Sequence, residues 1–134
     1  MNTMRILLVG LLLVATSLSF AQVKQSEEQF EQAKKCYLNA LDSENQGVRD
    51  SAILQVVKVK VKYPDENYQT IIRKLQKLSK RDDVFYIRTH AYLACEFFKH
   101  PELAQMINPA DYQVPAFFFD QLYQKITESP LAMN

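Results

Sequence analysis

Hydrophobic side chains recur every three or four residues along most of the chain, which is the spacing of one face of an α-helix. The pattern predicts helices over residues 26–41, 48–63, 68–80, 84–99 and 115–128, with a short helical turn at 102–107. Prolines and polar clusters separate these segments, as is typical of helix ends. The expected buried faces comprise Phe30, Ala33, Tyr37 and Leu41; Val48, Ala52, Val56, Val59 and Tyr63; Ile71, Ile72, Leu75 and Leu78; Ile87, Ala91, Leu93, Ala94 and Phe98; and Phe118, Leu122 and Ile126.

One segment has a competing pattern. Residues 57–62 alternate strictly between valine and lysine, which is typical of a β-strand. The run nevertheless continues the helical stripe that begins at Val48. We therefore expect a helix here, with a strand as the alternative.

A shift of 39 residues places one predicted helix on another. Residues 48–54 (Val-Arg-Asp-Ser-Ala-Ile-Leu) then align with residues 87–93 (Ile-Arg-Thr-His-Ala-Tyr-Leu), and the residue types agree at five of the seven positions. An internal repeat of this period indicates stacked helical hairpins. Because each repeat is stabilised by its neighbours, two hairpins alone would be marginal. The segment after Pro101 is therefore expected to form a third layer.

These repeated helices resemble the second helices of HEAT-like repeats, in the armadillo-type class of helical hairpins. The likeness rests on a hydrophobic residue followed by arginine, with alanine three residues beyond it: Val48–Arg49 with Ala52, and Ile87–Arg88 with Ala91. The resemblance implies an all-α fold, a short right-handed stack of two HEAT-like hairpins closed by a C-terminal helix. The small alanines would let neighbouring helices approach closely. A coincidental bundle of four or five helices is the alternative.

The resemblance also implies a structural role for the repeated arginine. In HEAT-like repeats this arginine commonly pairs with an acid in the preceding turn. For Arg49 that acid would be Asp42 or Glu44. For Arg88 it would be one member of the Asp82–Asp83 pair, which is also expected to cap the fourth helix.

The first 21 residues have the layout of a secretory signal peptide. Residues 1–5 carry one positive charge, residues 6–14 are apolar, and residues 19–21 offer small side chains at positions −3 and −1 of a cleavage site before Gln22. An uncleaved membrane anchor is the alternative, but the apolar core is about half the ~20 residues that a bilayer requires. Because residue 22 is not cysteine, a lipoprotein is disfavoured.

The expected organisation is therefore a signal peptide at 1–21, a HEAT-like domain at 22–129 and a flexible tail at 130–134. The mature protein would be periplasmic or secreted, with no stable membrane anchor after cleavage. The full sequence carries 16 basic and 15 acidic residues, and removal of Arg5 with the leader leaves 15 of each. A neutral balance gives no general attraction to nucleic acid.

Two cysteines remain in the mature chain, Cys36 and Cys95. In an oxidising compartment they could form a disulfide. Both also lie on predicted apolar helical faces, so two buried free thiols are the alternative. Spacing alone does not choose between the two, because a disulfide requires a specific geometry.

No motif in the sequence indicates catalysis, a metal site or a cofactor. His90 stands at the position of Ser51 in the repeat and is expected to be partly exposed. A zinc site would need three or four converging ligands, which the two histidines and two cysteines do not offer. The paired acids lie at predicted helix starts, where capping alone explains them. We therefore expect no enzymatic activity.

Basic residues gather in the middle of the chain, where Asp65 and Glu66 are the only acids between residues 58 and 81. Such a zone could bind an acidic protein segment or an anionic envelope polymer. The simpler alternative is a solvated helix face. The candidate residues are Lys58, Lys60, Lys62, Arg73, Lys74, Lys77, Lys80 and Arg81.

The second candidate surface is the aromatic run of Phe117, Phe118 and Phe119. Its simplest role is to close the end of the stack. Because successive helical residues are turned by about 100°, at least one of the three should be partly exposed and could dock a partner or a second copy.

These features together predict an exported, non-enzymatic protein-interaction module that binds a protein, possibly through an acidic segment. A small helical envelope enzyme or enzyme inhibitor is one alternative. A self-associating structural protein is another.

Overall fold

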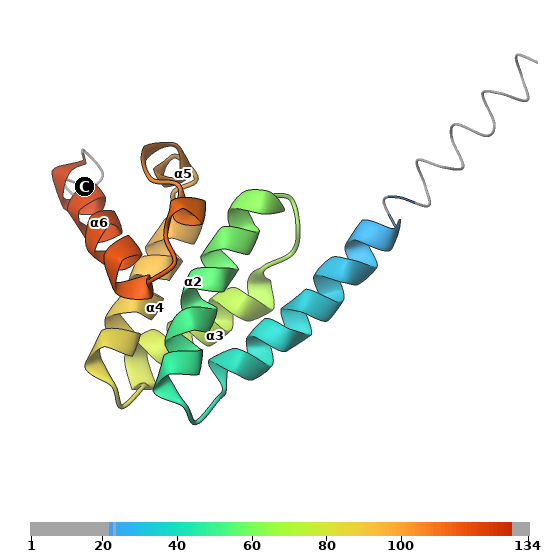
Figure 1. Ribbon diagram of the computed structural model, residues 1–134, viewed down its shortest axis with the longest axis horizontal. Coiled ribbons are helices and arrows are strands. Elements are labelled where there is room, and N and C mark those ends of the chain that lie inside the picture. Colours follow the sequence, from blue (N-terminus) through green and yellow to red (C-terminus); the bar gives the residue numbers. More distant parts are fainter. Residues whose placement is uncertain (1–21, 23, 130–134) are drawn as a thin grey trace, which may run out of the picture. The chain divides into compact units, whose positions relative to one another are not determined.

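The computed structural model describes Gln22 and residues 24–129. Within these residues the protein is all-α and holds no β-strand (Figure 1). An N-terminal helix covers residues 24–41. It is followed by α2 (Gln46–Lys62), α3 (Gln69–Arg81), α4 (Phe85–Lys99), α5 (Leu103–Met106), a 3₁₀ turn η1 (Pro109–Asp111) and α6 (Pro115–Glu128). The predicted helices are confirmed, and a 3₁₀ turn lies between the short helical turn and the last helix.

The chain divides into two compact units, with the boundary between Lys35 and Cys36 inside the N-terminal helix. In the described part of the first unit, Lys34 pairs with Glu31 at 2.7 Å, one turn earlier. The second unit contains the rest of that helix and every element from α2 to α6. The features discussed below all belong to this second unit.

The valine–lysine run lies entirely within α2. Successive residues Val56 and Val57 are both fully buried. A half-exposed strand would place them on opposite faces, whereas a helix packed on more than one side can bury both. α2 contacts α4, α6 and η1, so it is covered on several sides.

The core of the second unit is built around α4, which contacts α2, α3 and α6. Helices α2 and α4, which carry Ala52 and Ala91, lie side by side and run in the same direction (Figure 1). Both alanines are buried. The largest fully buried side chains are Phe118, Phe119, Leu41, Ile53, Leu54, Ile71, Leu75, Ile87, Leu103, Leu122, Val56 and Val57.

Local signals explain where the helices begin. The Asn45 side chain caps α2 by accepting hydrogen bonds from the backbone N–H groups of Gly47 and Val48, at 2.9 and 3.3 Å. Pro115 opens α6 at its first turn, where no N–H is needed. The N-cap residue of α4 is Val84, whose side chain makes no capping hydrogen bond. The Asp82 side chain, two residues earlier, accepts a hydrogen bond from the Val84 N–H at 2.9 Å.

Eight predicted core positions differ in the structure. Val48 is 42% exposed. The other seven are only partly buried: Ala33, Tyr37, Val59, Tyr63, Ile72, Phe98 and Ile126. In α4 the neighbouring Phe97 is buried in place of Phe98. The periodicity predicted the centre of each apolar face, and the position of the neighbouring helices decides which edges of that face are covered.

The predicted signal peptide at 1–21 and the tail at 130–134 lie outside the described residues. Within the described part, no helix combines the length and the apolar character that crossing a bilayer requires.

Candidate functional site

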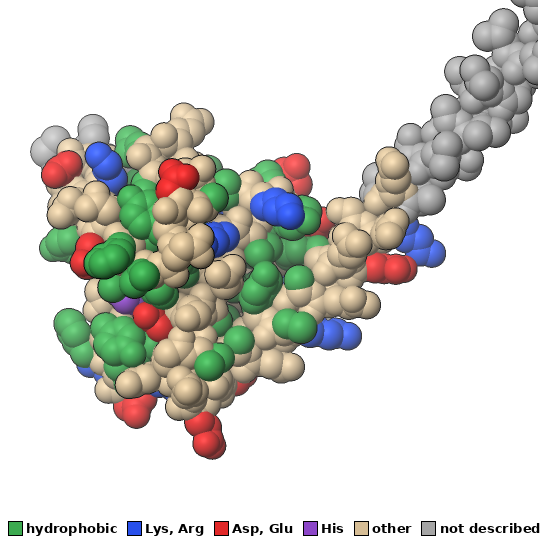
Figure 2. All heavy atoms as spheres, viewed as in Figure 1, with side chains coloured by type: hydrophobic (Ala, Val, Ile, Leu, Met, Phe, Trp, Pro, Cys, Tyr) green, Lys and Arg blue, Asp and Glu red, His purple; other side chains and the backbone are tan. Residues whose placement is uncertain are grey.

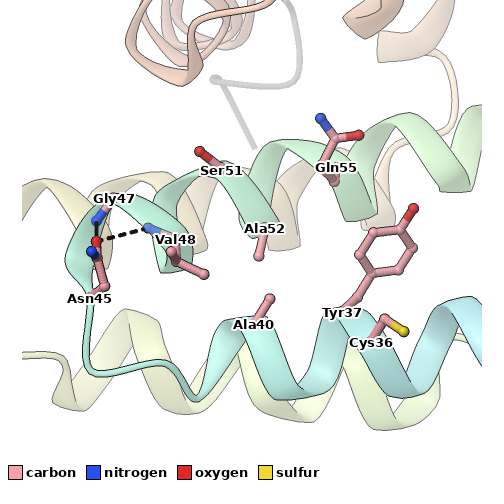
Figure 3. A pocket seen from close by; sticks show the side chains of 9 residues that line it. All are labelled: Cys36, Tyr37, Ala40, Asn45, Gly47, Val48, Ser51, Ala52 and Gln55. Atoms are coloured by element: carbon pink, nitrogen blue, oxygen red, sulfur yellow. Dashed lines mark hydrogen bonds between the residues drawn. The ribbon is translucent and has the colours of Figure 1, made fainter.

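A groove of about 530 Å³ runs between the end of the N-terminal helix and the start of α2 (Figure 3). Ala40 and Ala52 point toward one another across it, and the turn closes one end. Small side chains keep the groove open, because neither alanine reaches far from its backbone. The lining residues are Cys36, Tyr37, Ala40, Asn45, Gly47, Val48, Ser51, Ala52 and Gln55, none of which carries a charge.

The groove lies at a face that the other described residues leave uncovered. Val48 is exposed on its wall, and Figure 2 shows hydrophobic side chains at the surface over this region of α2 and the adjoining helix. The 39-residue shift places Val48 on Ile87, Ala52 on Ala91 and Gln55 on Ala94, all of which are fully buried in α4. The three positions that are buried against other helices in α4 therefore line an open groove in α2.

Arg49 forms a buried clasp between the two hairpins. Its Nε lies 2.9 Å from Asp82 Oδ2, an ion pair whose geometry falls short of a hydrogen bond, and its Nη2 donates to Asp82 Oδ1 at 3.2 Å. Arg49 Nη1 donates to the backbone carbonyls of Ser43 and Glu44 at 2.9 and 3.1 Å. The expectation that the carboxylate comes from Asp42 or Glu44 was wrong. Arg49 binds the preceding turn through carbonyls and takes its acid from the following hairpin.

Arg88 repeats part of this arrangement. Its Nη1 donates to the carbonyl of Asp82 at 2.6 Å, six residues earlier in the chain, just as Arg49 donates to the carbonyl of Ser43. The expectation that a carboxylate of Asp82 or Asp83 pairs with Arg88 was therefore wrong. Among the described residues Arg88 binds Asp82 only through the backbone carbonyl, and the Asp82 carboxylate pairs with Arg49. The two arginines occupy equivalent places 39 residues apart and share the hydrogen bond to the carbonyl six residues earlier.

The basic residues do not form one free face. Lys60 donates to the carbonyl of Pro64 at 2.7 Å and its Nζ lies 4.8 Å from the ring centre of Tyr68. Lys74 pairs with Asp42. Lys62 lies over the ring of Tyr63.

A shallow cleft of about 320 Å³ brings Lys74, Lys77 and Arg81 together beside the Arg49 clasp. Asp42, Asp82 and Asp83 line the same cleft, so most of its positive charge is balanced. Among the described residues, Lys77 and Arg81 form no ion pair. Lys58, Arg73 and Lys80 do not line this cleft.

The aromatic run divides as the helical geometry predicts. Phe118 and Phe119 are fully buried, whereas Phe117 is 65% exposed. The Phe118 ring makes edge contacts with Phe97 and Tyr112, at centroid distances of 6.1 and 5.5 Å. Two of the three rings therefore hold α6 on the core, and Phe117 alone is available to a partner.

His90 is buried, and the expectation that it lies partly at the surface was wrong. Its Nδ1 lies 2.6 Å from Asp50 Oδ1 on α2, and its ring stacks on Phe119 of α6 at 4.5 Å. The histidine thus links three helices. Sequence reasoning missed this role because Asp50 and Phe119 approach His90 only in the folded chain.

Both cysteines carry free thiols in the structure, so the candidate Cys36–Cys95 disulfide is not formed. Cys36 is exposed at the groove, whereas Cys95 is buried in α4. Burial raises the pKa of the Cys95 thiol from 9.0 to about 11.

The two thiols should therefore differ sharply in reactivity. We expect iodoacetamide at neutral pH to label Cys36 readily and Cys95 only after unfolding, because alkylation requires an accessible thiolate. Mass spectrometry of the labelled protein, with and without denaturant, measures this. Rapid labelling of Cys95 in the folded protein would contradict the burial of α4.

The described residues contain no group of three or more histidine, cysteine or acidic side chains placed to hold a metal ion. Comparisons of the chain with protein-family models, with curated proteins and with solved structures find no match.

Proposed function

We propose that the protein is a HEAT-like helical-repeat module that binds another protein and has no catalytic activity. The matching carbonyl hydrogen bonds of Arg49 and Arg88 and the parallel, contacting helices α2 and α4 support the repeat architecture. The hydrophobic leader supports export to the periplasm or the cell exterior.

The groove between the N-terminal helix and α2 carries this proposal. Stacked helical repeats bury the faces of neighbouring units, and an end unit without a neighbour presents an open packing surface. Here the open surface is uncharged and hollow, and the small side chains of Ala40, Ser51 and Ala52 allow a helix of a partner to approach closely. The proposed partner element is therefore a helix with a neutral, largely apolar docking face.

A charge placed in the groove tests the proposal. Val48 is the third residue of α2 after the Asn45 cap, where glutamate favours both the cap and the helix dipole. Val48→Glu should therefore keep the fold, as circular dichroism and thermal unfolding would show. We expect the variant to lose proteins that the wild-type protein captures by chemical cross-linking in an envelope extract, including untagged copies of the same chain.

Tyr92→Glu is the matched control, since Tyr92 is exposed on α4 and does not line the groove. It should capture the same proteins as the wild-type protein. Equal capture by Val48→Glu and the wild-type protein would remove the groove from the proposal.

A second candidate surface is the cleft at Lys77 and Arg81. It is a candidate because neither side chain forms an ion pair with another described residue. It would bind an acidic segment. The double substitution Lys77→Glu/Arg81→Glu should weaken binding to a short polyglutamate peptide by roughly tenfold or more, and added salt should weaken the wild-type complex. Fluorescence anisotropy measures both effects.

Lys74 is unsuitable for this test, because its charge is engaged by Asp42 and reversal would disturb the turn before α2. Lys58→Glu is the control, since Lys58 does not line the cleft. If the affinity for the peptide changes neither with added salt nor with the Lys77→Glu/Arg81→Glu substitution, this surface is excluded.

A further inference from the structure

We infer that the groove is filled by a second copy of this chain, related by a two-fold axis that passes near Cys36. This inference rests on the proposed function and names the occupant of the same groove. The resulting dimer would bring two N-terminal helix–α2 surfaces face to face.

The absence of charge in the groove favours this occupant. Residues close to a two-fold axis lie near their own copies, so any charged side chain there would face a like charge. The chain as a whole is rich in charge, with 16 basic and 15 acidic residues, yet all nine groove residues are neutral. A partner selected by charge would require the opposite arrangement.

The internal repeat supplies a second argument. Ile87, Ala91 and Ala94 occupy the register of Val48, Ala52 and Gln55, and helices of this same chain cover them completely. The equivalent surface in the first hairpin keeps the spacing, the β-branched residue and the central alanine of a surface for which this chain already provides packing helices, and it differs at its edge, where Gln55 stands in the place of Ala94. A second copy of the chain meets that requirement without any other protein.

The distribution of thiols is the third observation. Cys95 is buried, which leaves Cys36 as the accessible thiol of the described residues, and it lies on the groove. A single accessible cysteine in an exported protein suggests pairing between molecules. With oxidised glutathione as oxidant, two Cys36 thiols would lose two protons and two electrons to form one disulfide, and one glutathione disulfide would be reduced to two glutathione thiols.

The experiment combines light scattering with non-reducing electrophoresis on the purified protein. With reductant, we expect a concentration-dependent dimer whose dissociation constant rises roughly tenfold or more in Val48→Glu, because the substitution places two like charges at the interface. With oxidised glutathione, we expect a covalent dimer in the wild-type protein and in Cys95→Ser, but not in Cys36→Ser. Tyr92→Glu should behave as the wild-type protein does.

Each outcome bears on the inference. A monomer at every concentration and in both redox conditions overturns it, as does a dimer that Val48→Glu leaves intact. A dimer that Val48→Glu abolishes but that never cross-links through Cys36 overturns the position of the axis. If the protein stays monomeric while Val48→Glu still loses a different captured protein, the second copy is excluded and the proposed function stands.

Discussion

Replacing Asp82 with alanine should lower the free energy of unfolding by about 3 to 5 kcal/mol, because it removes the buried carboxylate paired with the Arg49 guanidinium and leaves only the solvent-exposed Asp83 as a counter-charge. The Asp82 side chain is only 4% exposed and makes the contacts to Arg49 Nε and Nη2. The two carbonyls that Arg49 also binds carry only partial charges and cannot replace a carboxylate. The same substitution removes the hydrogen bond to the Val84 N–H.

Urea unfolding of a short variant series separates these effects. Asp82→Asn removes the charge but keeps an oxygen that can accept from the Val84 N–H. The difference in unfolding free energy between Asp82→Asn and Asp82→Ala therefore measures the contribution of this hydrogen bond. Asp83→Ala is the control: this neighbouring acid is 92% exposed and lies 3.6 Å from Arg49, and its removal should cost about 0.5 kcal/mol or less. Equal losses for Asp82→Ala and Asp83→Ala would show that the clasp does not stabilise the fold.

Phe118→Ala should destabilise the protein by a similar amount, about 3 to 5 kcal/mol, because it removes a fully buried ring and leaves a cavity beneath α6. The adjacent Phe117 provides a control with identical chemistry. Phe117→Ala changes a largely exposed side chain and should alter stability by about 0.5 kcal/mol or less. Thermal unfolding of the two variants side by side measures the contrast.

A Phe117→Ala variant that unfolds as readily as Phe118→Ala would show that α6 is rotated from the orientation described here. The burial of Phe118 also decides which substitution can test docking through the aromatic run. Phe118→Asp would bury a charge and disrupt the core, so any loss of association would be uninformative. Phe117→Asp probes the exposed ring with the core intact.

The Arg49 clasp stabilises the fold, whereas the groove is the proposed binding surface. The clasp joins the turn before α2 to the turn before α4, and so fixes the first hairpin against the second. The groove lies on the part of the first hairpin that the clasp does not cover. A substitution at Asp82 should therefore weaken the scaffold, whereas one at Val48 should alter binding while the scaffold remains.

Sequence periodicity alone predicted the helices with boundaries close to those observed, because helical spacing, capping residues and prolines act over only a few neighbouring positions. The valine–lysine run shows how context works even at this level, since the stripe beginning at Val48 outweighed a local strand pattern. Helical geometry also required that one of the three successive phenylalanines be exposed, and Phe117 is that residue.

The tertiary structure alone decided the partners and the open surfaces. Arg49 pairs with Asp82, 33 residues away, and His90 pairs with Asp50, 40 residues away. Val48 and Ile87 occupy the same register, yet one lines an open groove and the other is fully buried. Local sequence sets the character of each helix face, but pairing and burial depend on which distant elements arrive beside it, and those contacts form only when the whole chain packs.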